Sequence, residues 1–205
     1  KDELQPLPTL PERVEGKVVM VTGATSGIGK ATALKLARAG ATVLVVARTA
    51  EKLDETLHEI DQLGGTAQAY SCDVSDLNSV DQLVQQVIAD HGHVDVLVNN
   101  AGRSIRRSVV HSFDRFHDYE RTMQLNYFGA LRLIMQLMPA MIERGGGHVI
   151  NISSIGVLTN APRFSAYVAS KAALDAFTRC ASSELAHEGI RFTTINMPLV
   201  RTPMI

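Results

Sequence analysis

The stretch that decides the fold is TGATSGIGKATAL, which runs from Thr22 to Leu34. It follows the apolar run KVVMVT and carries Gly23, Gly27 and Gly29 just before a segment with helical spacing. Glycines at a strand-to-helix turn allow a tight backbone path and let a pyrophosphate approach the free N–H groups of the helix. The spacing is G-x-x-x-G-x-G rather than G-x-G-x-x-G, and close packing alone can explain an isolated glycine-rich turn. Placed between the first strand and the first helix of an alternating chain, the turn predicts a dinucleotide-binding site.

From Lys17 onward, short β-branched runs alternate with longer stretches whose apolar residues have helical spacing. Because the short runs are apolar on both faces, they predict parallel strands covered by helices on both sides. We therefore expect a doubly wound α/β sheet with right-handed crossovers. The predicted strands are KVVMVT (17–22), TVLVVA (42–47), TAQAYSCD (66–73), VDVLVN (94–99), GHVINIS (147–153) and RFTTIN (191–196), and the long helices lie around 114–137 and 165–187.

Composition narrows the class of protein. The 205 residues are 45% hydrophobic, enough for one sizeable core, and the net charge of -1 provides no field that would favour nucleic acid or an anionic membrane. Cys72 and Cys180 are the two cysteines, and no CxxC or Cys/His cluster indicates a metal, so a reducing, cytoplasmic setting fits best. No apolar run is long enough to span a bilayer, and no signal-peptide pattern is present.

The first sixteen residues, KDELQPLPTLPERVEG, contain three prolines and end in Gly16. Prolines at this density predict an extended segment. We expect residues 1–16 to be a linker or leader, as though residues 17–205 were a domain taken from a longer polypeptide.

The end of the second predicted strand bears on the choice of cofactor. An acidic residue there would hydrogen-bond the ribose of NAD and repel the 2′-phosphate of NADP. This chain has Ala47 and Arg48 instead. Because a guanidinium can pair with that phosphate, we expect NADPH; the alternative is that Arg48 simply faces solvent.

Polar segments follow several predicted strands at the carboxyl edge of the sheet, where folds of this kind bind ligands. They are CDVSD around Asp73, NNAG at 99–102, NISS at 151–154 and NMPLVRT at 196–202. Each alone is typical of a turn. A further segment, SAYVASKAALDAF (165–177), places Tyr167 and Lys171 one helical turn apart on one face. Together and in this order, the segments predict one site.

With these motifs the chain resembles the short-chain dehydrogenase/reductase family from about Gly16 to its end. The resemblance implies a Rossmann-type fold and a catalytic set of Asn126, Ser154, Tyr167 and Lys171. In that family pattern, Tyr167 would donate a proton to the carbonyl oxygen and Ser154 would hydrogen-bond the developing oxyanion. Lys171 would hold the nicotinamide ribose, and we also expect its ammonium to lower the pKa of Tyr167. Asn126 would hold a water that links Lys171 to solvent, the alternative being a helix kink satisfied locally.

The resemblance also implies the positions that contact NADP. The family commonly has Pro-Gly after the sixth strand, whereas this chain has Pro198-Leu199, which predicts a different loop shape. Val200 and Thr202 match the family, and the chain ends at Ile205, before the last strand and the substrate-covering segment that the family normally has. The expected cofactor-binding residues are Gly23, Thr25, Ser26, Gly27, Ile28, Gly29, Arg48, Asp73, Val74, Asn100, Ala101, Gly102, Tyr167, Lys171, Pro198, Val200 and Thr202.

The substrate is suggested by the segments 101–133, 153–180 and 197–205, which resemble the reductase domain of bacterial fatty acyl-CoA reductases. That group often carries an N-terminal partner domain, which fits the proline-rich leader. In RSIRR, the residues Arg103, Arg106 and Arg107 lie near the expected active site and could meet the phosphates of coenzyme A. The alternative is a solvated basic loop whose arginines pair with Asp114, Asp118 or Glu120.

These features favour NADPH-dependent reduction of a long-chain acyl-CoA to the aldehyde, with further reduction to the alcohol left open. Two alternatives remain: a ketone, aldehyde or 3-oxoacyl reductase of the same family, and a non-catalytic cofactor-binding module. The family resemblance implies a homodimer or tetramer formed through the two long helices. We expect a cytoplasmic protein; whether an acyl substrate brings it to a membrane surface stays open.

Overall fold

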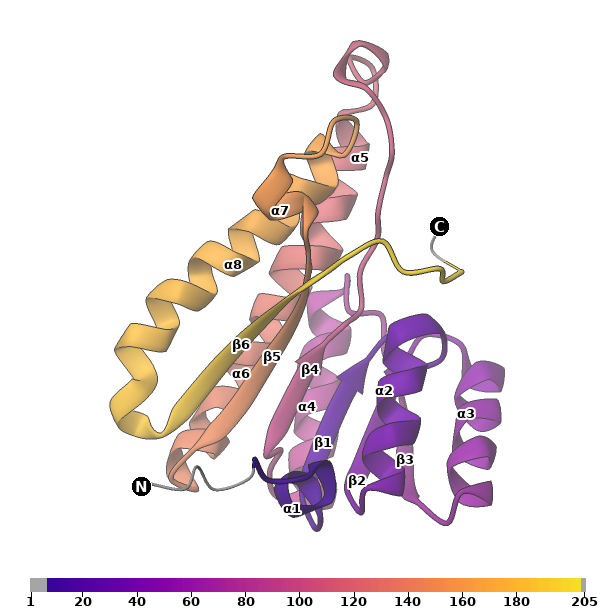
Figure 1. Cartoon of the computed structure of the whole chain (residues 1–205), viewed down its shortest axis with the longest axis vertical. Helices are drawn as coiled ribbons and strands as arrows, with labels where there is room; N and C mark the ends of the chain where they lie inside the picture. The colour runs from indigo at the N-terminus through magenta and orange to yellow at the C-terminus, as the bar shows by residue number, and fades with distance from the viewer. Residues whose placement is uncertain (1–6, 204–205) are drawn as a thin grey trace, which may run out of the picture.

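Six parallel strands form a single sheet at the centre of the chain (Figure 1), in a computed structural model that describes residues 7–203. The strand order is β3-β2-β1-β4-β5-β6, which confirms the doubly wound prediction. The order reverses between β1 and β4, so the carboxyl ends of these two strands flank the crevice where such sheets bind ligands. The strands are β1 (Val18–Thr22), β2 (Thr42–Ala47), β3 (Thr66–Ser71), β4 (Val96–Asn99), β5 (Gly147–Ser154) and β6 (Ile190–Met197).

Helices cover the two faces of the sheet and create two hydrophobic cores. On one face, α2 and α3 pack against alternate side chains of the central strands, such as Val19 and Val43. On the other face, α4, α6 and α8 pack against the intervening side chains, such as Met20 and Leu44. No helix within residues 7–203 is long and apolar enough to cross a bilayer. These helices are α2 (Gly27–Arg38), α3 (Ala50–Gln62), α4 (Leu77–His91), α6 (Ala130–Glu143) and α8 (Ser165–Leu185), and a short α7 (Gly156–Thr159) follows β5.

The leader departs from the prediction of an extended linker. Residues 10–14 form a short helix, α1 (Leu10–Val14), whose last residue, Val14, is buried in the core shared with α2. The backbone N–H and the hydroxyl of Thr9 both donate to the Glu12 carboxylate, at 2.6 and 2.8 Å. These bonds and Pro11 in the first turn favour a helix start. The extended shape is therefore not found at residues 10–14, whereas the role of residues 1–16 as a linker or leader stays a prediction; the first six of these residues lie outside the described part of the chain.

The predicted helix around 114–137 is a continuous helical run from Phe116 to Glu143, interrupted by a π-helical turn. Its parts are α5 (Phe116–Met123), the π turn η2 (Gln124–Gly129) and α6. Such turns are rare and frequently occur at functional sites. Here the turn contains Asn126, one of the predicted catalytic residues.

Gly129, at the end of this π turn, sets how closely the helix approaches the loop after β3. A Cβ at Gly129 would lie 2.0 Å from the Val74 carbonyl oxygen, a backbone atom that cannot move alone. We expect Gly129→Ala to lower the free energy of unfolding by about 1–3 kcal/mol, as overpacking does. Chemical denaturation checks this, with Glu143→Ala at the exposed end of α6 as the control. Equal stability of the two variants would contradict the packing described here.

Candidate active site

The glycine-rich turn after β1 has the backbone shape that the sequence predicts. Gly23 and Gly27 have φ angles of +63° and +51°, in the left-handed region that residues with a Cβ rarely adopt. A Cβ at Gly29 would lie 2.3 Å from the Gly23 carbonyl oxygen. The helix α2 begins at Gly27, so its free N–H groups lie at the carboxyl edge of the sheet, where they can meet an anion.

The NNAG segment after β4 is hydrogen-bonded to this turn. The Thr22 hydroxyl oxygen accepts from the backbone N–H groups of Asn100 and Ala101, both at 3.0 Å. The Asn100 amide donates to the carbonyl oxygens of Thr22 at 2.9 Å and Gly23 at 3.2 Å. These bonds fix the ends of β1 and β4 relative to each other. Apart from its place at the start of the motif, nothing in the sequence indicates this role for Thr22.

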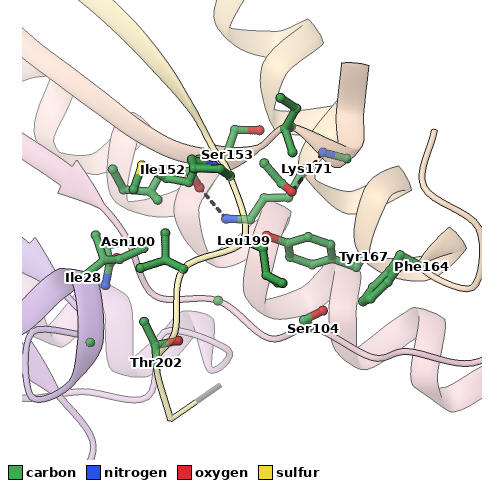
Figure 2. Close-up of a pocket in the computed structure, with 18 of the residues that line it drawn as sticks. Ile28, Asn100, Ser104, Ile152, Ser153, Phe164, Tyr167, Lys171, Leu199 and Thr202 are labelled. Carbon is green, nitrogen blue, oxygen red and sulfur yellow. Dashed lines mark hydrogen bonds between the residues drawn. The ribbon is translucent and has the colours of Figure 1, made fainter. Parts of the chain in front are cut away.

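A cavity of about 580 Å³ opens beside the turn and extends to α8. Figure 2 shows side chains from the turn, from β5, from α8 and from the segment after β6 around the same space. Of the predicted cofactor residues, Thr25 and Gly29 line neither this cavity nor the smaller one described below. The predicted residues that line the large cavity are Gly23, Ser26, Gly27, Ile28, Asn100, Ala101, Gly102, Arg106, Ser154, Tyr167, Lys171, Pro198, Val200 and Thr202.

One wall of this cavity is apolar, which the polar motifs of the sequence do not predict. Leu199, at the position where the family commonly has glycine, lines it with its side chain 83% exposed. Thr202 passes over the glycine turn, because a Cβ at Gly27 would lie 3.1 Å from its methyl group. The rest of the wall includes Ile155, Phe164, Val168 and Met197. Their apolar side chains beside the polar motifs are the only indication of this wall in the sequence.

A second cavity, of about 310 Å³, lies beside the ends of β2 and β3. It is lined by Arg48, Asp73 and Val74, all three predicted from the sequence. It shares Gly23, Ala101 and Gly102 with the larger cavity, so the two meet at the NNAG segment.

Asp73 is held in its ionised form at this second cavity. The Ser75 hydroxyl and backbone N–H donate to Asp73 Oδ1 at 2.7 and 2.9 Å. Burial favours the neutral acid, but these bonds and the charges of Arg48 and Arg103 together lower the pKa of Asp73. Arg48 therefore lies close enough to Asp73 for the two charges to interact at the end of β2.

Lys171 and Tyr167 both project from α8 into the large cavity, as Figure 2 shows. The Lys171 side chain is buried, with 5% exposed, and its ammonium donates to the Ile152 carbonyl oxygen of β5 at 2.7 Å. Burial lowers the pKa of Lys171 to about 8. Ser154, at the end of the same strand, accepts from the Gly156 N–H at 3.1 Å, a bond that does not use the proton of its own hydroxyl.

The expected effect of Lys171 on Tyr167 is not found. Burial raises the pKa of the Tyr167 phenol, and the hydrogen bond with Ser154 only partly opposes that rise. The prediction of a lowered pKa is wrong in this structure because the Lys171 ammonium is directed at the backbone of β5. A neutral phenol beside Ser154 is suited to donate a proton rather than to remove one.

Asn126 is buried in the π turn, and its side chain is fully used in local contacts. Its Oδ1 accepts from the Arg103 N–H, and its amide donates to the Arg103 carbonyl, both at 2.8 Å. The second amide hydrogen is donated to Ser170 Oγ at 2.9 Å. These bonds agree with the alternative of a locally satisfied kink and position the loop after NNAG next to α8. A water held by Asn126 remains a prediction that these contacts do not test.

The three arginines predicted to bind substrate lie in three different environments. Arg106 lines the large cavity, whereas Arg103 lines the second one. Arg107 lies 3.5 Å from the Asp118 carboxylate, and its backbone N–H donates to the Arg163 carbonyl at 2.7 Å. Arg107 is therefore part of an ion-paired loop, the alternative to a substrate contact. Of the three arginines, Arg106 alone lines the cavity that contains Tyr167.

The residues of the two cavities fit a nicotinamide dinucleotide. The glycine turn lies where the two cavities meet, and the N–H groups at the start of α2 lie beside it, where a pyrophosphate needs them. Arg48 and Asp73 line the side that suits the adenosine, and Tyr167 and Lys171 line the side that suits the nicotinamide. Within residues 7–203, no group of three or more His, Cys, Asp or Glu is arranged to hold a metal ion.

Comparisons with known proteins agree with this geometry. The fatty acyl-CoA reductase of Acinetobacter baylyi is 63% identical over 194 residues, which are 95% of this chain and 66% of that protein. The 3-oxoacyl-[acyl-carrier-protein] reductase FabG of Thermotoga maritima is 35% identical over 192 residues, which are 94% of this chain and 77% of that protein. The chain thus spans just under two thirds of the length of its Acinetobacter relative.

The fold is likewise that of solved family members. A metagenomic short-chain oxidoreductase in complex with NADP matches with a TM-score of 0.84 and 36% identity, over 89% of this chain and 82% of that one. The family model described as short chain dehydrogenase matches residues 17–205. With its parallel sheet, its glycine turn and the Ser154, Tyr167 and Lys171 cavity, the chain belongs to the short-chain dehydrogenase/reductase family.

Proposed function

We propose that the protein reduces a long-chain fatty acyl-CoA to the aldehyde with NADPH. The observation that carries the proposal is that Ser154, Tyr167 and Lys171 open into one cavity with an apolar wall. The 63% identity to a fatty acyl-CoA reductase supports the same substrate class. Reduction of the aldehyde to the alcohol would use the same residues.

Two side chains would act on the thioester carbonyl, and a third would hold the cofactor. Ser154 Oγ would donate a hydrogen bond to the carbonyl oxygen as negative charge develops there. The Tyr167 phenol would transfer its proton to that oxygen. The Lys171 ammonium, anchored on Ile152, would hold the nicotinamide ribose. When bound, NADPH supplies the hydride. Hydride on carbon and the Tyr167 proton on oxygen give a thiohemiacetal, whose C–S bond then breaks; its hydroxyl proton passes to the sulfur, which leaves the aldehyde and the free thiol of coenzyme A.

An apolar wall beside these groups would receive the acyl chain. Phe164 and Val168 at the start of α8 and Leu199 after β6 all line the cavity that contains Tyr167. Each methylene that leaves water contributes about 0.8 kcal/mol, so a long chain would bind better than a short one. The cavity thus supports a hydrophobic carbonyl substrate.

Arg48 should decide the choice between NADPH and NADH. In Arg48→Asp, the guanidinium that would meet the 2′-phosphate is replaced by a carboxylate that would repel it and bind the ribose of NADH. We expect the ratio of kcat/KM for NADPH to that for NADH to fall by about a hundredfold, the size of two charge-assisted contacts. Initial rates with both cofactors give the ratio. Lys52→Asp, the same charge change on the exposed side of α3, should leave it unchanged; equal ratios in both variants would remove Arg48 from the proposal.

Arg106 should help to recognise coenzyme A. Because it lines the cavity, we expect Arg106→Ala to raise KM for palmitoyl-CoA by about five- to tenfold through loss of a charge-assisted contact, with little change for decanal. Arg107→Ala is the matched comparison, since Arg107 pairs with Asp118 and its loss should affect both substrates alike. Steady-state kinetics on the intact protein decide this, and equal effects of Arg106→Ala on both substrates would exclude the contact.

A 3-oxoacyl or simple carbonyl reductase is the second candidate. The 35% identity to a 3-oxoacyl reductase favours it, and the cavity suits any hydrophobic carbonyl compound. Thiol release distinguishes the two, because only thioester reduction frees coenzyme A. The intact set of Ser154, Tyr167 and Lys171 makes a cofactor-binding module without catalysis the weakest of the three proposals.

We also propose that the protein is a homodimer or tetramer. Phe128 and Met135 are 45% and 56% exposed on η2 and α6, the helical run expected to pair between subunits. Exposed apolar side chains on one helix are typical of such interfaces. The cytoplasmic setting and a fusion to an N-terminal domain are part of the same proposal and rest on the sequence.

A further inference from the structure

A chain of hydrogen bonds crosses the core between the sheet and α8, outside both cavities. The Asn99 amide of β4 donates to Asn151 Oδ1 of β5 at 2.9 Å, and the Asn151 amide donates to Thr178 Oγ1 of α8 at 2.8 Å. The Thr178 hydroxyl donates its own proton to the Leu174 carbonyl oxygen at 2.7 Å. Because that proton is used within α8, Thr178 Oγ1 accepts from Asn151, and the direction of each bond in the chain is fixed.

These polar side chains are buried in an otherwise apolar contact. Asn99, Asn151 and Thr178 are each at most 5% exposed, and Val149 and Leu174 belong to the hydrophobic core on the same face of the sheet. Apolar packing has no preferred direction, whereas a hydrogen bond restricts both distance and angle. A buried amide that loses its partner is also costly. The bond from Asn151 to Thr178 therefore favours one placement of α8 on β5.

The face of α8 that packs on the sheet has few large side chains to fix this placement by itself. Small side chains let a helix approach closely, but they form shallow ridges that interlock weakly. Within α8, which the structure describes in full, Leu174 is the one large apolar residue among the buried ones, which are Ala166, Ser170, Lys171, Leu174, Thr178 and Ala181. A directional bond at Thr178 is therefore a main restraint on sliding of α8.

The same contact between β5 and α8 positions Lys171. Two helical turns, about 10 Å, separate Lys171 from Thr178 on one face of α8. The Lys171 ammonium donates at 2.7 Å to the carbonyl oxygen of Ile152, the residue after Asn151. A slide of α8 by about 1 Å would be enough to break such a bond. We propose that Asn151 and Thr178 are positioning residues, whose hydrogen bond holds the Lys171 ammonium on the Ile152 carbonyl.

The functional meaning of this inference rests on the proposed role of Lys171 in holding the nicotinamide ribose. Thr178→Val keeps the shape of the side chain and removes the acceptor of the Asn151 amide, whereas Thr178→Ser keeps the hydroxyl. Thr56→Val is the matched control. Thr56 is buried on α3 and donates to the Lys52 carbonyl oxygen at 2.8 Å, but within residues 7–203 no side chain donates to it. Unfolding temperatures show which variants are folded, and Asn151→Ala, which removes the same bond from the strand side, replaces Thr178→Val if that variant is not.

The first measurement follows the Lys171 ammonium by NMR of protein labelled with ¹⁵N-lysine and needs no turnover. Its signal is the one missing in Lys171→Met. In Thr178→Val we expect the titration midpoint to rise from about 8 toward 10.5, because an ammonium released from Ile152 regains contact with solvent in the cavity. The other titratable residues that line the cavity, Arg106 and Tyr167, are the same in all these variants. Thr178→Ser and Thr56→Val should keep the midpoint of the intact protein, and an unchanged midpoint in folded Thr178→Val would overturn the inference.

The second measurement is kcat/KM for decanal reduction with NADPH. Thr178→Val should lower it by about tenfold, since small displacements of a catalytic group are costly, and Thr178→Ser and Thr56→Val should change it by less than about twofold. If Thr178 acts through Lys171, its replacement should have almost no further effect in Lys171→Met. An equal loss in both backgrounds would overturn the inference. If Lys171→Met itself leaves kcat/KM unchanged, the proposed role of Lys171 fails, while the NMR midpoint still decides whether Thr178 positions it.

Discussion

Replacing Tyr167 by phenylalanine should lower kcat for carbonyl reduction by about a thousandfold while NADPH still binds. The change removes one hydroxyl, the proton donor of the proposed mechanism, and positioned proton donors contribute about 10²- to 10⁴-fold. Because a phenol is protonated at neutral pH and burial raises the pKa of Tyr167 further, the loss should be nearly constant between pH 6 and pH 8. Stopped-flow rates and a fluorescence titration with NADPH separate catalysis from binding.

Tyr119→Phe is the matched control for this change. The Tyr119 hydroxyl is hydrogen-bonded to Ser165 Oγ at 3.0 Å, between α5 and the start of α8, outside both cavities. The Tyr119→Phe variant also loses one phenol hydroxyl, but from α5 and outside the cavities. Its kcat should therefore change by less than about threefold, as for a peripheral substitution. Comparable losses in the two variants would mean that Tyr167 acts only by holding α8 in place.

Lys171→Met should lower kcat/KM for reduction by about a hundredfold, the size seen when one preorganised electrostatic group is removed. The ammonium lies beneath the cavity and donates to the Ile152 carbonyl, so its loss removes both a ribose ligand and a fixed positive charge. In the intact protein, burial lowers the pKa of Lys171 from its ordinary 10.5 to about 8. The rate of reduction should therefore fall above about pH 8, and this dependence should be absent in Lys171→Met.

The same pKa predicts how stability depends on pH. Between about pH 8 and 10.5 the folded state has lost the Lys171 proton while the unfolded state retains it. Since the unfolded state binds more protons there, the free energy of unfolding rises with pH across this window, and the cost of burying the charge is complete below about pH 8. The difference in unfolding free energy between the intact protein and Lys171→Met should follow this curve. For Lys35→Met, at an exposed position, the difference in unfolding free energy from the intact protein should not depend on pH. A difference for Lys171→Met that is likewise independent of pH would contradict the lowered pKa.

Most of the sheet could be predicted because its strands are short apolar runs separated by helical spacing. The six predicted strands match β1 to β6 within two residues at each end. The helix at residues 10–14 was missed because three prolines outweighed the Thr9 and Glu12 capping pattern, which was legible in the sequence. The π turn could not be predicted, since it depends on how closely Gly129 approaches Val74 across the fold.

The site residues likewise fall into those that the sequence predicts and those that it does not. Residues in motifs at strand ends, such as Ser154 and Asp73, lie where the motifs predict, because the topology brings carboxyl ends together. Long side chains in loops do not follow from the sequence. Arg103, Arg106 and Arg107 are nearly adjacent, yet they face two cavities and one ion pair. The direction of the Lys171 ammonium, toward Ile152, likewise depends on tertiary packing.

The most direct test of the proposed function is to follow NADPH oxidation and free thiol together when the intact protein meets palmitoyl-CoA. Thioester reduction to the aldehyde predicts one thiol for each NADPH, or one for every two if the alcohol is formed, and no thiol with Tyr167→Phe. NADPH oxidation with decanal but no thiol from palmitoyl-CoA would contradict acyl-CoA reduction and leave a simple carbonyl reductase.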